Sequence, residues 1–470
     1  MLPTSLTRSL TLLLAVGAPL WALSDDPAPA PVETPEETPA PEEPVEEEPA
    51  EAAAPSEPAT LLRGERVHVR PGEVLENGEV LVRGGFIVAV GHGLEVAEDT
   101  IIIEGKEICA GFIDPWSTLG IDSASANDLG TGASTATATA ASPYGEKYAR
   151  QWAREAGVLM TRTQVGKNAS VGGIGAILRP SASSEHLVVL GDANLNVTCG
   201  VRGDVFDRVM EADRIGSMIA GGLSYREGQV EYAYELKEWE EAIAEKEAEL
   251  EKDFKKAKKD RDKEIEKAAE KDKEFKEERY KEDKRPREPR YNADSEVFAR
   301  VAHGELPLVV EAHGAAELRA LLAATESFGR LRLVISGATG AAAFADQLAD
   351  REITVMLQPL APGARGSGGR SGFDNSLFGT LAEAGVEVLI GTGGDRAADL
   401  PIMAHLAIAG GLEREAAFEA LTLGAARTFD LADRFGSVEV GKVAELLILD
   451  GAPLEGRPTH VFTAGEVVEL

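Results

Sequence analysis

Short apolar runs alternate with longer segments of helical character between residues 308 and 423, and this alternation restricts the fold more than any other feature. The expected strands are 308–310, 331–335, 353–357 and 386–390, and the expected helices are 315–326, 341–350, 377–384, 400–409 and 414–423. Strands that alternate with helices form parallel β/α units, and strands that are apolar throughout are covered on both faces. A closed β/α barrel and an open doubly wound sheet both satisfy this pattern.

The two ends of the folded part predict a second, smaller sheet. Short strands separated by Gly or charged turns are expected at 66–69, 79–82, 86–90 and 100–103. So small a sheet is marginal by itself. Strands expected at 445–449 and 460–463 supply the missing partners, which joins the two ends of the chain in one β domain.

Residues 1–24 have the features of a secretory signal peptide, with Arg8 ahead of an apolar stretch and small residues at the exit. An uncleaved membrane anchor is the alternative, but the apolar run is too short to span a bilayer. No later segment has the length and apolarity of a membrane helix. We therefore expect an exported protein, in the periplasm or on the surface of a bacterium, with no membrane span after cleavage.

Residues 25–60 carry twelve Asp or Glu, no Lys or Arg, and ten of the 24 prolines. Such a segment buries too little apolar surface to fold, so it is expected to be a disordered acidic linker; calcium binding is the alternative. The whole chain has 48 Lys or Arg against 80 Asp or Glu, a net charge of −32. That charge repels phosphates and excludes nucleic acid as a general partner.

Residues 236–290 interrupt the alternation with a long charged segment. Within 241–290 there are 18 Lys or Arg and 18 Asp or Glu, so the net charge is zero. Opposite charges recur at helical spacing, as in Glu251 with Lys255, and this favours a solvated helix or helical hairpin. The alternative is a coiled coil that binds a protein partner, although the apolar positions hold no heptad.

Two segments carry a resemblance to a known family. Residues 109–120 (CAGFIDPWSTLG) resemble the first-strand motif of the amidohydrolase superfamily, in which Pro-Gly-x-Ile-Asp leads into His-x-His. Residues 436–446 (GSVEVGKVAEL) resemble the Gly-Ser-x-x-x-Gly-Lys-x-Ala-Asp-Leu motif of its returning half. The similarity covers about 61–235 and 291–470 and is strongest to the imidazolonepropionase-like branch.

The resemblance implies an α/β fold, a distorted (β/α)8 barrel of TIM type with a small composite β-sandwich built from both chain ends. The expected parts are 61–110 and 431–470 for the two halves of the sandwich, 111–235 and 291–430 for the two parts of the barrel, and 236–290 for the charged helical insertion.

The resemblance also implies metal-dependent hydrolysis of carbon–nitrogen bonds other than peptide bonds, with one or two divalent ions, usually zinc, that activate water. This chain departs from the family pattern. Trp116 and Thr118 stand where the paired histidines belong, and Gly393 occupies the place of the last-strand aspartate. Tryptophan has no lone pair to offer a metal, and a threonine hydroxyl is a poor ligand.

The remaining candidate ligands are Glu311, His313 and Asp395, with Asp395 also the candidate catalytic base. Asp114, Trp116, Thr118 and Gly393 are expected at the barrel mouth, where Asp114 is interpreted as structural. No cofactor is expected, and zinc is the expected ion if the site still functions.

Three functions stay open at this point. The leading hypothesis is an exported amidohydrolase-like pseudoenzyme with a binding or structural role, for which a small-molecule ligand and homo-oligomerisation are open. The second is an active metal-dependent C–N hydrolase with an unusual site. The third is an envelope spacer that acts through the charged helix and a protein partner.

Cys109 and Cys199 are the only cysteines. An exported protein permits a disulfide, but a bridge requires the two Cα atoms to lie within about 7 Å. We expect two separate buried thiols.

Overall fold

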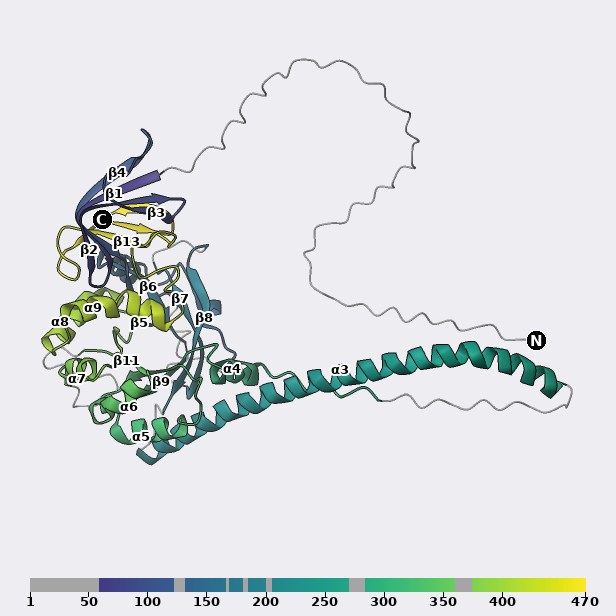
Figure 1. Cartoon of the computed structure of the whole chain (residues 1–470). Helices are drawn as coiled ribbons and strands as arrows, with labels where there is room; N and C mark the ends of the chain where they lie inside the picture. The colour runs from purple at the N-terminus through teal and green to yellow at the C-terminus, as the bar shows by residue number, and fades with distance from the viewer. Residues whose placement is uncertain are drawn as a thin grey trace, which may run out of the picture. The chain divides into compact units, whose positions relative to one another are not determined.

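A computed structural model describes residues 59–121, 132–165, 169–180, 185–199, 205–269, 284–359 and 374–470, with only the backbone described for residues 205 and 247–269. The expected signal peptide and almost all of the expected acidic linker lie outside these residues. The described chain contains two β-sheets and the helices that cover one of them (Figure 1). No described helix has the length and apolar character needed to cross a membrane.

The smaller sheet has seven strands in the order β15-β14-β13-β4-β1-β2-β3. Its strands are β1 (Ala59–Arg70), β2 (Glu73–Arg83), β3 (Phe86–Gly91), β4 (Ile101–Ala110), β13 (Leu446–Leu449), β14 (Pro458–Thr463) and β15 (Glu466–Glu469). The N-terminal and C-terminal strands meet where β4 pairs antiparallel with β13. The composite sheet expected from both chain ends is therefore confirmed.

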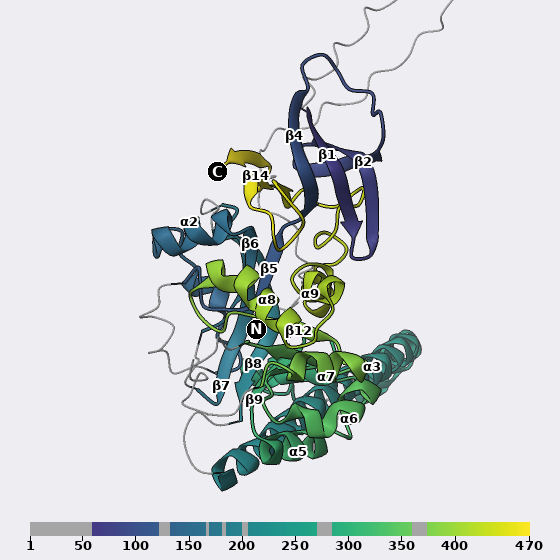
Figure 2. The same ribbon diagram turned by 90° about the vertical axis from the view of Figure 1, so that its left-hand side faces the viewer.

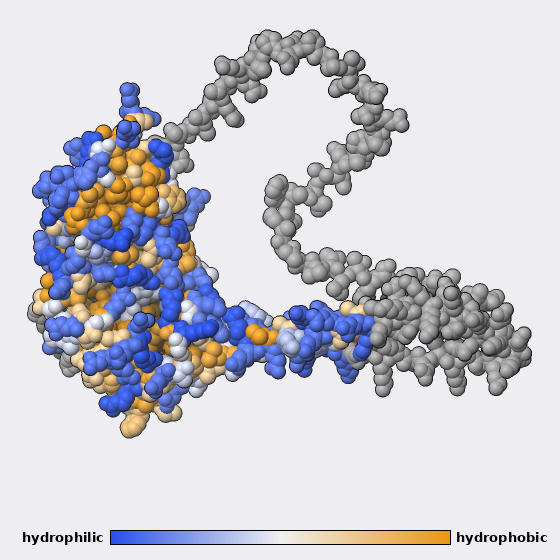
Figure 3. All heavy atoms as spheres, viewed as in Figure 1, coloured by the Kyte–Doolittle hydropathy of each residue, from blue (hydrophilic) through white to orange (hydrophobic). Residues whose placement is uncertain are grey.

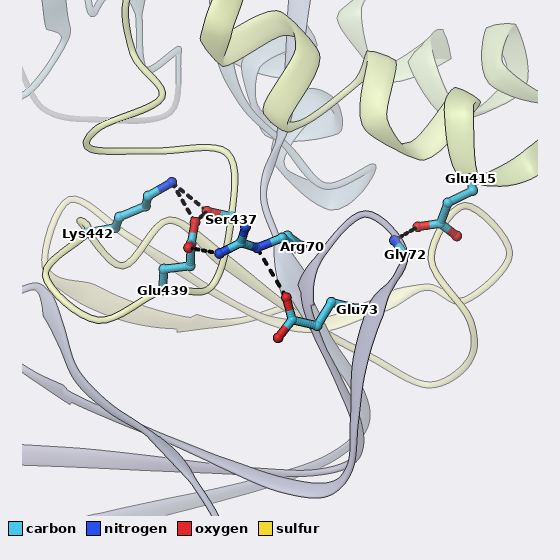
Figure 4. A network of polar contacts seen from close by, with 7 residues as sticks. All are labelled: Arg70, Gly72, Glu73, Glu415, Ser437, Glu439 and Lys442. Atoms are coloured by element: carbon cyan, nitrogen blue, oxygen red, sulfur yellow. Dashed lines mark hydrogen bonds and ion pairs between the residues drawn. The ribbon is translucent and has the colours of Figure 1, made fainter.

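The turn between β1 and β2 is fastened to the C-terminal part of the chain by polar contacts (Figure 4). Arg70 pairs with Glu439, and Lys442 Nζ lies 2.9 Å from the same carboxylate and 2.6 Å from Ser437 Oγ. The amide of Gly72 donates a hydrogen bond to the Glu415 side chain. These contacts hold segments more than 300 residues apart in sequence.

A buried ion pair connects the composite sheet to the barrel. Glu445, which is 3% exposed, accepts hydrogen bonds from Arg179 Nε at 2.5 Å and from the Thr463 hydroxyl at 2.6 Å. Burial raises the pKa of the Glu445 carboxyl, while Arg179 opposes that rise. A glutamate here replaces the aspartate of the family motif and keeps a carboxylate at the junction.

The larger sheet has eight strands in the order β5 to β12. They are β5 (Phe112–Ser117), β6 (Val158–Thr163), β7 (Val171–Leu178), β8 (Val188–Thr198), β9 (Leu308–Ala312), β10 (Leu333–Gly337), β11 (Thr354–Leu357) and β12 (Val388–Ile390). A parallel bridge between Ser117 and Gly394 brings the first and last strands together, so the sheet is a nearly closed barrel. The expected barrel is confirmed.

One strand departs from a regular (β/α)8 pattern. β7 pairs antiparallel with both β6 and β8, whereas every other strand pair in this sheet is parallel. An antiparallel strand needs only a turn to reach its neighbours, and no helix lies between β6 and β8 in the described chain. The barrel is distorted at this point.

Helices cover the outside of the barrel. They are α2 (Lys147–Glu155), α3 (Val205–Ala269), α4 (Ala293–Ala302), α5 (Ala315–Ala324), α6 (Ala345–Asp350), α7 (Leu377–Glu383), α8 (Leu400–Ala409), α9 (Arg414–Ala420) and α10 (Leu423–Thr428), with short 3-10 turns at Thr137–Ala140, Ala341–Phe344 and Ala397–Asp399. Helices α5 to α8 follow the outer side of β9 to β12 (Figure 2). The helix expected at 414–423 is α9, which ends at Ala420, and a further helix, α10, follows it from Leu423.

Side-chain alternation separates an outer core from the lumen. Val310, Ile335 and Val355 pack with residues of the surrounding helices in one buried cluster. Their neighbours along the strands, including Val309, Val334, Met356 and Leu389, form a second cluster that therefore lies inside the barrel.

The first part of the charged insertion, residues 236–269, belongs to a single helix, whereas residues 284–290 are not helical. α3 is 65 residues long and begins at Val205, well before residue 236 (Figure 1). Its first part is packed: Ala212, Ile215 and Ile219 are fully buried, and a Cβ on Gly216 would lie 2.8 Å from the carbonyl oxygen of Ala324. Residues 270–283, the later part of the expected insertion, lie outside the described residues.

Both cysteines are free and buried, which confirms the expected pair of separate thiols. Cys109 pairs with Leu447 in the composite sheet, whereas the Cys199 amide bonds to Glu311 O beyond the end of β8.

Candidate functional site at the barrel mouth

Strand β5 places the motif that suggested the family. Asp114 is fully buried and accepts hydrogen bonds from the amides of Trp116 (3.1 Å) and Thr392 (3.2 Å) and from the Thr392 hydroxyl. These bonds join β5 to the residues that follow β12. Burial raises the pKa of Asp114 to about 7, and its hydrogen bonds limit that rise. Asp114 therefore lies inside the barrel as a structural group.

Trp116 fills part of the lumen. Its residue is 5% exposed and packs in the inner cluster with Met160, Val309, Met356 and Leu389. Gly391, at the end of β12, makes room for it, since a Cβ there would lie 2.5 Å from Trp116 Cβ. The indole thus takes up space in the lumen near the mouth.

Arg162 on β6 is a second large side chain in the lumen. It is fully buried, and its guanidinium donates hydrogen bonds to Asn194 Oδ1 (2.9 Å), Gln164 Oε1 (2.7 Å), Pro115 O (3.1 Å) and Asn196. Burial lowers the pKa of Arg162 to about 9, and the charge of Asp114 opposes that change. The guanidinium remains charged at neutral pH.

Beneath this network, Arg162 Cζ lies 5.5 Å from the centre of the Phe429 ring. Amide and carbonyl oxygens together with an aromatic face therefore surround the buried cation.

Glu311 and His313 form a pair at the carboxyl end of β9. The His313 Nε2 lies 3.1 Å from Glu311 Oε1, and both side chains are partly exposed. The backbone amide of His313 donates to Glu317 Oε2 at 2.8 Å. The imidazole lies against Gly337, where a Cβ would approach Cε1 to 2.5 Å. Glu311 and His313 therefore form a hydrogen-bonded carboxylate–imidazole pair at the mouth.

The residues after β12 close the mouth on the other side. The Gly393 amide donates to Trp116 O at 2.7 Å, and the Thr118 amide donates to Gly394 O at 2.9 Å. Gln358 Nε2 donates to Thr392 O at 2.6 Å. Thr118 is half-buried, whereas Asp395 is exposed.

The predicted metal ligands are only partly brought together. Glu311 and His313 are in contact, but among the described residues no three His, Cys, Asp or Glu side chains form a group that could hold an ion. At the two first-strand positions, the indole of Trp116 has no lone pair to offer a metal and the Thr118 hydroxyl is a poor ligand. The hydroxyl of Ser117 between them is bonded to Gly394 O. The residues that line the described mouth do not fit the divalent metal that amidohydrolases usually hold.

Sequence reasoning missed the inner polar network. Arg162 stands in a strand whose six residues are all buried, and Asn194 and Asn196 alternate along β8 on the same face. An arginine within an apolar run and amides at alternate strand positions were the available signals.

Comparison with known proteins agrees with this fold. The sequence model of the amidohydrolase family matches residues 376–468. An amidohydrolase from Thermotoga maritima superposes with a TM-score of 0.65 at 21% identity, covering 87% of this chain and 99% of that one. The ochratoxinase of A. niger gives a TM-score of 0.50 at 13% identity, covering 88% and 96%.

An adenosine deaminase from Xanthomonas campestris, solved with bound zinc, gives a TM-score of 0.47 at 16% identity, covering 88% and 93%. No curated protein matches the chain. The C-terminal sequence matches the amidohydrolase family and the fold is similar to that of a solved amidohydrolase, in agreement with the resemblance seen in the sequence.

Proposed function

We propose that this chain is an exported protein of the amidohydrolase fold that acts by binding and does not hydrolyse carbon–nitrogen bonds through a metal. The observation that carries the proposal is Trp116, which is buried in the lumen at the position of the first paired histidine. The partly exposed mouth around Glu311 and His313 is then a binding surface for a small polar molecule.

Metal content tests this proposal. Purified protein is incubated with excess zinc, dialysed, and analysed for metal and for hydrolysis of cyclic amides and N-acylated amino acids. We expect well under one tightly bound divalent ion per chain and no turnover, because one histidine cannot supply the nitrogen-rich shell that zinc prefers. Near-stoichiometric zinc, or turnover that a chelator abolishes, would contradict it.

A second candidate function rests on the Glu311–His313 pair. A carboxylate that holds an imidazole at 3.1 Å is an arrangement suited to a general base, so the alternative is a hydrolase in which His313 takes a proton from water. In that case His313→Gln abolishes turnover and Glu311→Gln reduces it. If His313→Gln keeps full activity, this candidate is excluded.

A further inference from the structure

Helix α3 continues beyond the body to which its first part is packed. The hydrogen bonds that tie it to α4 and its flanks come from Tyr225, Arg226 and Gln229, whose side chains reach Asn292, Glu305 and Glu296. From residue 230 to 246 most of its residues are exposed. On the face shown in Figure 3, the coloured part of the projecting helix is predominantly hydrophilic.

The exposed part of α3 presents a line of glutamates. The members are Glu227, Glu231, Glu235, Glu238, Glu241 and Glu245, and all six are exposed. Successive members are three or four residues apart, so they share one face of the helix. Among the described side chains, only Lys237 forms an ion pair with one of them, at 3.8 Å from Glu241. Like charges at this spacing oppose helix formation unless a cationic partner neutralises them.

The next part of the same helix has the opposite charge. Residues 227–246 contain seven glutamates and two lysines, whereas residues 252–263 contain seven Lys or Arg and three Asp. Both segments belong to one continuous helix, which ends at Ala269. Their centres are about 30 Å apart along the axis, beyond the screening length of about 8 Å at physiological salt. The two segments cannot neutralise each other within one copy of the helix.

Two copies of α3 that lie antiparallel satisfy this charge pattern. We propose that two copies of this chain associate through α3, with residues 227–246 of one copy against residues 252–263 of the other. A parallel arrangement would place the acidic segments together, so the charges select the antiparallel one. Residues 227–263 together carry nine Lys or Arg and thirteen Asp or Glu, so each copy brings a net charge of only −4 of the total of −32 to the contact.

The test is the oligomeric state of the full chain, measured by size-exclusion chromatography with light scattering. We expect a dimer at low salt and dissociation at high salt. The first variant reverses the acidic segment, with Glu231→Lys, Glu235→Lys, Glu238→Lys and Glu245→Lys. The second reverses the basic segment, with Lys252→Glu, Lys255→Glu, Lys256→Glu and Lys259→Glu. Each variant alone should be monomeric, and an equimolar mixture of the two should dimerise.

The matched control changes four exposed glutamates of the composite sheet and the loop before β4, with Glu65→Lys, Glu95→Lys, Glu98→Lys and Glu104→Lys. It alters the net charge as much as the first variant does and should remain dimeric.

If something other than a second copy of the chain binds the line of glutamates on α3, the association measurements give different results. A wild-type chain that is monomeric at low salt overturns the proposal and indicates that the face is covered within the chain or by another protein. A dimer that survives reversal of the glutamates but not of the lysines also overturns it, because the lysines would then meet acidic residues elsewhere. A mixture of the two variants that stays monomeric excludes the proposed pairing.

Discussion

The lumen of the barrel and the exposed part of α3 both carry charge, but they use it in opposite ways. In the lumen, Arg162 is fully buried and its guanidinium donates to four oxygen acceptors. On α3, the glutamates from 227 to 245 are exposed, and one ion pair at 3.8 Å is formed by the described side chains. A buried charge without its partners is costly, whereas an exposed charge is solvated by water. Stability thus depends on the few buried charges, and the proposed association depends on the many exposed ones.

The largest expected effect is the loss of the buried cation. Arg162→Met leaves the acceptors of Asn194, Gln164 and Pro115 without this donor, whereas Asn196 Oδ1 keeps its bond from Asn194 Nδ2. It also removes the counter-charge of Asp114, so the free energy of unfolding should fall by about 3–5 kcal/mol. Urea denaturation measures this change. Arg162→Lys, which keeps the charge but not the planar fork, should lose less. Equal losses for Met and Lys would mean that the charge itself contributes nothing.

Removal of the indole should have a similar or slightly smaller effect. Trp116→Ala opens a cavity among Met160, Val309, Met356 and Leu389, and such truncations cost about 3–5 kcal/mol. Trp116→Phe is the control, because it retains most of the apolar volume. An unchanged melting temperature for the alanine variant would show that Trp116 does not fill the lumen.

The pH dependence of the free energy of unfolding reports on the ionisation of Asp114. Its pKa rises from 3.8 in the unfolded chain to about 7 in the folded one, so the folded state holds an extra proton between these values. Stability from this group is therefore greatest at the acid end and is lost as the pH rises toward about 7. Asp114→Asn cannot titrate, so its stability relative to the wild type should increase from about pH 4.5 to about pH 7.5. A difference that does not vary with pH would place the titration elsewhere.

The smallest expected effect on stability comes from α3. Replacing residues 241–285 by a short Gly/Ser linker removes exposed helix and most of the proposed dimer contact, so the variant should be monomeric. Its melting temperature should be nearly unchanged, because surface charge pairs contribute little. The far-ultraviolet circular dichroism signal of helix should fall. Aggregation or loss of a cooperative transition would show that this part of α3 is packed on the body or on a partner subunit.

The sequence predicted the strands well where they are apolar throughout. The strands at 308–312, 333–337, 354–357 and 388–390 follow continuous apolar runs, and their positions agree closely with the expectation. The start of α3 was not predicted. Its first part, with Ala212, Ile215 and Ile219, packs on the barrel core, and only the charged segment that follows was recognised as helix. The antiparallel direction of β7 is set by pairing between strands, which no local pattern records.

The site was predictable only in part. Trp116 and Thr118 could be identified from the first-strand motif, and Glu311 with His313 from the resemblance to the family. The inner network escaped prediction because an arginine in a strand is ordinarily taken for a surface residue, and its buried position depends on Asn194, Asn196 and Gln164 from other parts of the barrel.

Gly393 restricts which side chains this edge of the mouth can carry. A Cβ at this position would lie 2.7 Å from Gln358 Oε1, and the backbone φ of +70° disfavours any other residue. An aspartate at 393 would have to displace the Gln358 side chain, which donates a hydrogen bond to Thr392 O. A carboxylate therefore cannot be introduced at this position without strain in the backbone and a second change at Gln358.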